Sequence, residues 1–184
     1  MIHQTASQYD KVIERCRTIF LSKSKDYGTS WRVMRITSIA DQIFIKAQRI
    51  RTIEEIGKQM VDDDIESEFM GIINYCLIAL IQMELKNDKE IDLDMPRLTI
   101  LYDKHITETK TLMLQKNHDY GEAWRDMLIS TFTDMILMRI HRIKQIELSN
   151  GKTIMSEGID ANFRDMINYS VFALIQMDEQ KISK

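Results

Sequence analysis

Apolar residues recur every three or four positions along most of the chain, which is the spacing of one face of an α-helix. In the first half this pattern predicts two amphipathic helices. Their apolar positions are Tyr9, Val12, Ile13, Cys16, Ile19 and Phe20 for one, and Ile36, Ile39, Ile43, Ala47, Ile50 and Ile53 for the other. Gly28 and Gly57 follow these runs, where helices commonly stop. No segment alternates polar and apolar residues for long enough to predict a strand.

A third predicted helix is apolar nearly all round between Phe69 and Met83. A helix without a polar face must be covered on all sides. The run is too short to span a bilayer comfortably, and it contains Asn74 and Gln82. We therefore expect a buried bundle helix and no contact with a membrane.

The whole pattern occurs twice along the chain. Tyr9-Asp10-Lys11 returns 93 positions later as Tyr102-Asp103-Lys104, and after a one-residue insertion Ile73-Asn74-Tyr75 returns 94 positions later as Ile167-Asn168-Tyr169. A polar stretch that ends at Pro96 separates the copies, residues 1–90 and 91–184. Packing the two third helices against each other would cover both. We predict an all-α fold in which a tandem duplication of a three-helix unit forms one globular pseudo-dimer.

Charge and cysteine content narrow the class of protein. The formal net charge is −3, so no global basic field would attract nucleic acid, and a nucleic-acid partner is not expected. Cys16 and Cys76 lack a partner at metal or redox spacing, and the N-terminus lacks a signal-peptide pattern. Both features favour a cytoplasmic protein with reduced, buried thiols. Whether the pseudo-dimer pairs further into a homodimer is left open.

One string, K-x-x-D-Y-G-x-x-W-R, is spelled in both copies, at 23–32 and 116–125, and holds the chain's only two tryptophans. One interpretation is a ligand site. The lysines would meet a phosphate, the aspartates a divalent cation or a hydroxyl, and the aromatic rings would stack on a base. The other is structural: the aspartate caps a turn, the glycine supplies an unusual backbone angle, and the aromatic residues seal the end of a bundle. The sequence leaves both open.

The second helix of each half carries a carboxylate followed by two cations. Asp41, Lys46 and Arg49 in the first copy correspond to Asp134, Arg139 and Arg142 in the second. Such a stripe could bind phosphate oxygens beside a carboxylate. The alternative is a solvated face with ion pairs along the helix.

The third helices carry acidic residues amid apolar neighbours. A carboxylate such as Asp165 is costly there unless it is paired or bound to a metal. The first half has Gly71 at the position of Asp165, and it has Glu68 where the second half has Asn162. Superposed, the two copies make E-x-x-D, which places two carboxylates on one helical face in a geometry that can chelate Mg²⁺. The alternative is that acidic residues are simply favoured near a helix N-terminus.

The D-Y-G-x-x-W core, the Arg-Ile pairs near the ends of the second helices (Arg49-Ile50 and Arg142-Ile143) and the later I-N-Y helix resemble one family, nucleotide modification associated domain, type one. This resemblance implies a role in nucleotide metabolism or base modification. The layout is also similar, more weakly, to the all-α MazG-like nucleoside triphosphate pyrophosphohydrolases, which bind Mg²⁺ through E-x-x-E and E-x-x-D. Only Glu68 and Asp165 match those positions, one in each half, and Asp41 and Asp134 are lone carboxylates where that pattern has a pair.

The leading hypothesis is a nucleotide-binding protein, as an enzyme or former enzyme that hydrolyses a phosphoanhydride with Mg²⁺. The alternative is a non-catalytic helical module that binds a nucleotide or a protein. The second half is expected to be the better equipped. The candidate residues are, for catalysis, Asp119, Glu122 and Asp165; for Mg²⁺, Glu68, Asp134 and Asp165; and for substrate, Lys23, Asp26, Tyr27, Trp31, Arg49, Lys116, Tyr120, Trp124, Arg139 and Arg142.

Overall fold

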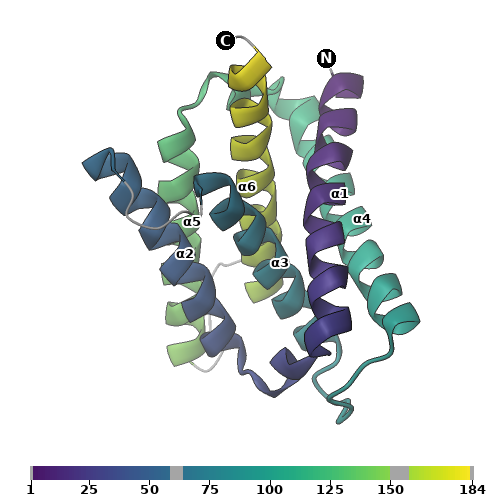
Figure 1. Ribbon diagram of the computed structural model, residues 1–184. Helices are drawn as coiled ribbons and strands as arrows, with labels where there is room; N and C mark the ends of the chain where they lie inside the picture. The colour runs from purple at the N-terminus through teal and green to yellow at the C-terminus, as the bar shows by residue number, and fades with distance from the viewer. Residues whose placement is uncertain (1, 59–63, 150–157, 183–184) are drawn as a thin grey trace.

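The structure, a computed structural model, describes residues 2–58, 64–149 and 158–182. These ranges form six α-helices and two one-turn 3₁₀ helices, without a strand (Figure 1). The elements in chain order are α1 (Ile2–Tyr27), η1 (Ser30–Val33), α2 (Ile36–Ile56), α3 (Ile65–Glu84), α4 (Met95–Tyr120), η2 (Ala123–Asp126), α5 (Ile129–Leu148) and α6 (Ile159–Ile182). The all-α prediction is confirmed.

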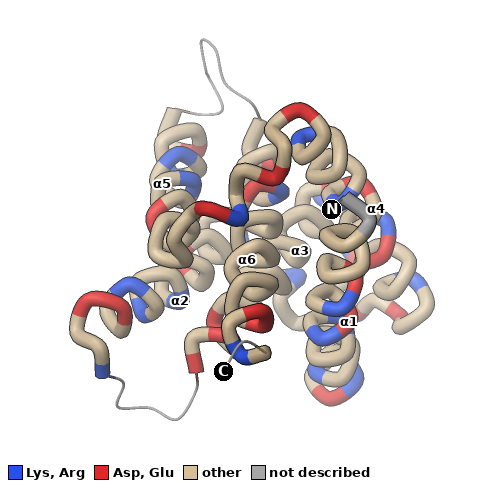
Figure 2. Tube along the Cα trace, turned by 90° about the horizontal axis from the view of Figure 1, so that it is seen from above, with Lys and Arg blue, Asp and Glu red and all other residues tan. Residues whose placement is uncertain are grey.

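The two halves repeat the same order of elements, and each element meets its counterpart. α3 packs against α6, α2 against α5, and α1 against α4. Figures 1 and 2 show α3 and α6 in the middle of the bundle, with α1 and α4 on one side and α2 and α5 on the other. The expected contact between the two third helices is therefore present. The connection from α3 to α4 falls in the predicted boundary, and Pro96 lies in the first turn of α4.

The burial of α3 explains its composition. Among the described helices it alone is long and apolar enough to cross a membrane by length and composition, with a mean hydropathy of 1.3. Its large side chains Phe69, Ile72 and Leu77 are fully buried, because α1, α2, α4 and α6 all contact this helix. The tertiary structure thus accounts for an apolar surface that a lone helix could not expose to water.

Matched hydrogen bonds tie each half to the other. The Tyr9 hydroxyl on α1 donates to Asn168 Oδ1 on α6 at 3.1 Å, and the Tyr102 hydroxyl on α4 donates to Asn74 Oδ1 on α3 at 3.2 Å. The first helix of each half is therefore anchored on the third helix of the opposite half.

Burial also raises the pKa of the Cys16 thiol to about 12 and that of Cys76 well above its usual value, so both thiols stay protonated.

Because the halves interlock, we expect residues 1–90 expressed alone to give no stable monomer. The faces of α1 and α3 that α4 and α6 cover would be open to water. A fragment of this size buries only a small hydrophobic core, so losing these contacts should unfold it. Far-UV circular dichroism and sedimentation of this fragment, alone and mixed with residues 91–184, measure the effect. Cooperative unfolding of a monomeric 1–90 fragment would contradict the interlocked arrangement.

Candidate functional site

The repeated string ends a helix and forms a one-turn 3₁₀ helix in both halves, although Glu122 has a φ of 59° where its counterpart Thr29 has −107°. α1 is followed by Gly28 at φ 63°, whose N–H donates to Ser24 O at 2.9 Å, and α4 is followed by Gly121 at φ 59°, whose N–H donates to Asn117 O at 3.0 Å. Both glycines lie in the left-handed region that closes a helix C-terminus. A one-turn 3₁₀ helix follows and carries the tryptophan, Trp31 in η1 and Trp124 in η2.

A glutamine on the third helix of each half holds this turn. Gln82 Nε2 donates to Arg32 O at 2.8 Å and to Met34 O at 2.9 Å. Gln176 Nε2 donates to Trp124 O at 2.9 Å and to Met127 O at 3.0 Å. The sequence analysis noted Gln82 only as a polar residue of the third helix and did not consider Gln176. Their recurrence in an apolar segment was the signal that could have identified them as anchors.

The arginine that ends the string is also structural. Arg32 donates to the carbonyls of Glu90 at 3.0 Å and Asp88 at 2.8 Å, in the segment between the halves. Arg125 donates to Glu122 Oε2 and to Glu179 Oε1, both at 2.9 Å, and thereby links η2 to the end of α6. These guanidinium groups fix the position of the tryptophan turns.

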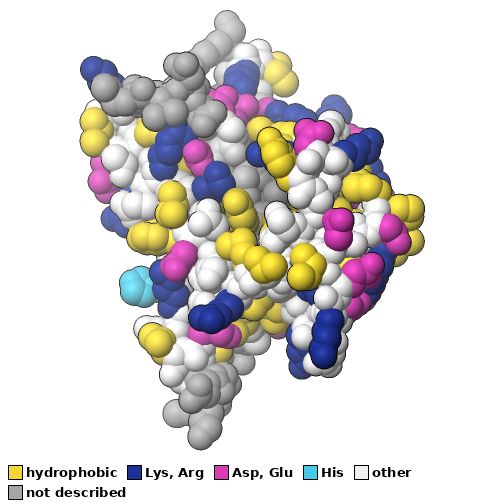
Figure 3. Space-filling model, turned by 60° about the horizontal axis from the view of Figure 1, so that its bottom comes forward, with side chains coloured by type: hydrophobic (Ala, Val, Ile, Leu, Met, Phe, Trp, Pro, Cys, Tyr) yellow, Lys and Arg dark blue, Asp and Glu magenta, His cyan; other side chains and the backbone are white. Residues whose placement is uncertain are grey.

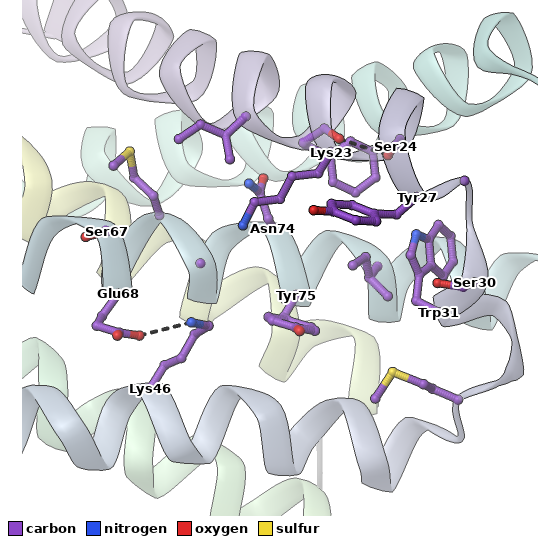
Figure 4. A pocket seen from close by; sticks show the side chains of 17 residues that line it. Lys23, Ser24, Tyr27, Ser30, Trp31, Lys46, Ser67, Glu68, Asn74 and Tyr75 are labelled. Atoms are coloured by element: carbon purple, nitrogen blue, oxygen red, sulfur yellow. Dashed lines mark hydrogen bonds and ion pairs between the residues drawn. The ribbon is translucent and has the colours of Figure 1, made fainter. Parts of the chain in front are cut away.

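A cavity of about 610 Å³ opens between α1, η1, α2 and α3. We call it the first-half cavity. Figure 4 shows Lys23 from α1 and Lys46 from α2 reaching into it from opposite sides, with Tyr27 and Trp31 at one end and Glu68 at the other. The floor is one face of α3, which includes Glu68, Gly71, Asn74, Tyr75 and Ile78.

Cations outnumber carboxylates around this cavity. Glu68 accepts from Lys46 Nζ at 3.0 Å and from Arg49 Nη1 at 2.6 Å. Lys23 is exposed and forms no ion pair with another described residue. Glu68 is the one acidic residue among the described lining residues, so two lysines on the wall face one carboxylate, which Arg49 also pairs. The local field favours an anion.

In the second half the equivalent side chains contact one another. Asp165, with 5 % of its side chain exposed, binds Lys116 Nζ at 2.9 Å through one oxygen and Arg139 Nη2 at 2.7 Å through the other. Trp124 is 6 % exposed, and its ring stacks on Phe172 at a centroid distance of 4.3 Å and an interplanar angle of 6°. The first-half cavity therefore lies in the half that the sequence analysis took to be the poorer one.

The residues predicted to be catalytic lie in separate networks. Asp119 is exposed beside His118, with 3.2 Å between the carboxylate and the ring nitrogen. Glu122 is buried and accepts from the Thr5 hydroxyl and from Arg125. Asp165 is held by its two cations. The contacts of the described residues give these three carboxylates no common site.

The predicted metal ligands are likewise apart. Glu68 and Asp165 each belong to their own half and each bind two cations, while Asp134 is exposed on α5 at 3.7 Å from Arg51. Within the described ranges no three side chains of His, Cys, Asp or Glu gather closely enough to hold a metal ion.

The remaining predicted substrate residues divide between the halves. Tyr27 is 75 % exposed and lies on the wall of the first-half cavity, whereas its copy Tyr120 is 74 % exposed at the end of α4. Asp26 is exposed, and Arg142 is half-buried on α5. Lys46, which the sequence analysis recorded only as part of a cation stripe, lines the first-half cavity.

Fold and site together define an all-α tandem duplication with one cationic, aromatic-walled cavity in its first half. Residues 23–83 and 116–177 both match the family described as nucleotide modification associated domain 1, and the chain belongs to this family. The matches start at the lysine of each string and run through each third helix. No curated protein and no solved structure matches the chain. The weaker similarity to MazG-like enzymes gains no support from these comparisons.

Replacing Glu122 by Gln tests its structural role. Burial raises the pKa of Glu122, but the Thr5 hydrogen bond and the Arg125 ion pair outweigh burial and hold it below the usual 4.5. The charged carboxylate therefore contributes stability above pH 4.5, which is lost as the pH falls through the lower folded-state pKa. We expect Glu122→Gln to cost about 2 kcal/mol at pH 7 and to reduce the pH dependence of unfolding below 4.5. Denaturant unfolding at several pH values measures both, and an unchanged pH profile would contradict this role.

Proposed function

We propose that the protein binds a nucleotide in the first-half cavity, with phosphate between Lys23 and Lys46 and the base against Tyr27 or Trp31. The observation that carries this proposal is the meeting of two lysines and two aromatic side chains around one cavity of about 610 Å³. Its volume is in the range of small-molecule sites. Membership of a nucleotide modification associated family points to the same ligand class.

The charges favour a phosphate over an uncharged ligand. Lysine ammonium groups bind phosphate as point charges with rotatable donors. Lys46 shares Glu68 with Arg49, so the lysine can turn toward a phosphate while the arginine keeps the carboxylate paired. An unpaired buried carboxylate would be costly, and Arg49 removes that cost.

The aromatic residues favour a ligand with a flat ring. Tyr27 is largely exposed although it lines the cavity, and Trp31 is half-buried beside it. Stacking of a base on such a ring contributes about 1–3 kcal/mol.

Basic and acidic side chains are interspersed with hydrophobic ones on the face shown in Figure 3. We therefore propose a small ligand rather than a nucleic-acid strand.

Binding, and not hydrolysis, is the activity that the described side chains support. A hydrolase of the predicted kind needs carboxylates that hold Mg²⁺ and activate water. Glu68 is the one described carboxylate on the cavity wall, and two cations already engage it. Any Mg²⁺ in the complex would therefore arrive with the phosphates of the nucleotide.

We expect Lys23→Ala to weaken nucleotide binding by about tenfold or more, because one charge-assisted contact is lost. Lys23 forms no ion pair with another described residue, so the fold should be unaffected. The matched control is Lys25→Ala, which removes an exposed lysine of the same string that does not line the cavity. Isothermal titration calorimetry with a panel of nucleoside triphosphates measures the effect. Equal affinity of both variants and the wild type would contradict the proposal.

Trp31 provides a direct optical test, because the chain has two tryptophans. In the Trp124→Phe variant the remaining emission comes from Trp31, and stacking of a base should quench it. In Trp31→Phe the emission comes from Trp124, which is buried against Phe172 and should respond little. Quenching that persists unchanged in Trp31→Phe would place the ligand elsewhere.

We expect nucleotide binding to persist in EDTA, and we expect no release of phosphate or pyrophosphate from the bound nucleotide. The cavity cations neutralise the phosphates, and the described residues provide no three-ligand metal cluster. Calorimetry with EDTA and with MgCl₂, followed by a phosphate-release assay on the same samples, measures both. Turnover that requires Mg²⁺ would establish the hydrolase instead.

A further inference from the structure

We infer that Asp165 and Phe172 of the second half occupy the positions that a ligand takes in the first half: Asp165 that of its terminal phosphate, and Phe172 that of its base. The ligand is then a nucleoside di- or triphosphate, bound once per chain. This inference rests on the proposed function and specifies its ligand. It comes from a comparison of the two copies inside one molecule.

The duplication supplies a residue-by-residue correspondence between the cavity and its counterpart in the second half. The corresponding pairs lie on equivalent elements, α1 and α4, η1 and η2, α2 and α5, and α3 and α6. They are Lys23 with Lys116, Trp31 with Trp124, Lys46 with Arg139, Gly71 with Asp165, and Ile78 with Phe172. The cations and the tryptophan are kept, whereas these two floor residues differ, as does Glu68, which corresponds to Asn162.

Asp165 marks the position of an anion. Its two oxygens bind Lys116 and Arg139, one each, in a place where its side chain is almost fully buried. The first half keeps both cations as Lys23 and Lys46 but has Gly71 on the floor. A Cβ built on Gly71 would lie 2.8 Å from Lys46 Cε and 3.1 Å from its Nζ, so Lys46 passes directly over the glycine. In the first half Glu68 pairs with Lys46, but Lys23 forms no ion pair with another described residue, so an anion at the place of Asp165 would lie between Lys23 and Lys46 and pair with both.

Phe172 marks the position of a flat ring. It lies parallel to Trp124 at a stacking distance, which is the arrangement a nucleobase adopts on an indole. Ile78 stands at this position in the first half and leaves Trp31 on the cavity wall. A ligand ring placed beside Ile78 would make the contact that Phe172 makes in the other half.

The spacing of Asp165 and Phe172 along α6 indicates the length of the ligand. Asp165 and Phe172 are seven residues apart on α6, as are Gly71 and Ile78 on α3. Seven residues correspond to about 10 Å along a helix axis. This is longer than the reach from base to phosphorus in a nucleoside monophosphate and fits an extended di- or triphosphate. The cavity floor runs from Ser67 to Ile78, long enough to hold both ends.

Calorimetry of two reciprocal exchanges tests the inference. The probes are ATP, GTP, CTP and UTP, then the di- and monophosphate of whichever binds best. Gly71→Asp supplies the first half with its own carboxylate, and Gly71→Ala is the control that adds a side chain without charge. Both side chains displace only the end of Lys46, so the helix should tolerate them. Asp165→Gly with Phe172→Ile gives the second half the residues that the first half has at these two floor positions.

The wild type should bind one equivalent, with the triphosphate or diphosphate about tenfold or more tighter than the monophosphate, since each further phosphate adds charge-assisted contacts. The affinity of Gly71→Asp for the nucleotide should be at least tenfold lower than that of Gly71→Ala. The double variant should bind two equivalents. If the double variant does not fold by circular dichroism, the comparison of the two Gly71 variants decides alone.

The outcomes separate this inference from the proposed function. A wild-type chain that binds none of the probes overturns both. A wild type that binds nucleotide while Gly71→Asp and Gly71→Ala behave alike overturns the assignment of the phosphate position and leaves the proposed function standing. Two equivalents bound by the wild type, or a monophosphate bound as tightly as the triphosphate, likewise overturns only the inference.

Discussion

The mutual cover of α3 and α6 is the constraint on which the rest of the structure depends. Each third helix is apolar on nearly all sides and cannot face water, so the two helices bury one another and the remaining helices surround them. This contact fixes the pseudo-two-fold relation between the halves. It also positions α1, α2, α4 and α5, whose apolar faces close the bundle, and it places the tryptophan turns through Gln82 and Gln176.

Buried charge explains why the two halves differ. A carboxylate next to an apolar core is tolerated when cations and hydrogen bonds compensate its lost hydration. Glu68 meets this condition with Lys46 and Arg49, and Asp165 with Lys116 and Arg139. In the second half the carboxylate lies between the cations of two helices. In the first half it lies at one end, and Lys23 is left facing the cavity.

The sequence predicted the fold well because the fold follows from periodicity and repetition. The spacing of apolar residues gave the helices, and the duplicated apolar third helix gave the central contact. The site was predicted only in part. Lys23, Tyr27, Trp31 and Glu68 do line the first-half cavity. Lys46 was predicted only as one cation of a possible phosphate-binding stripe, and the second half was favoured.

The candidate site differs from the prediction for a physical reason: whether a cavity forms depends on how side chains from several helices pack, which the linear sequence does not show. Along the chain, the exchange of Gly71 for Asp165 was interpreted as part of a metal motif, and the exchange of Ile78 for Phe172 carried no signal. Their effect appears only when the carboxylate reaches two cations and the ring reaches an indole. Glu122 shows the same limit: its place in a catalytic-looking string gave no sign that Thr5 and Arg125 would bury it.

The bonds between the first and last helices have a consequence for synthesis. Tyr9 and its partner Asn168 are 159 residues apart, and Arg15 on α1 pairs with Asp178 on α6 at 2.7 Å. A ribosome delivers α1 before α6, so the part of α1 that rests on α6 is made well before its partner. Such long-range closure slows folding. The face of α1 that α6 covers therefore stays open to water until α6 has left the ribosome.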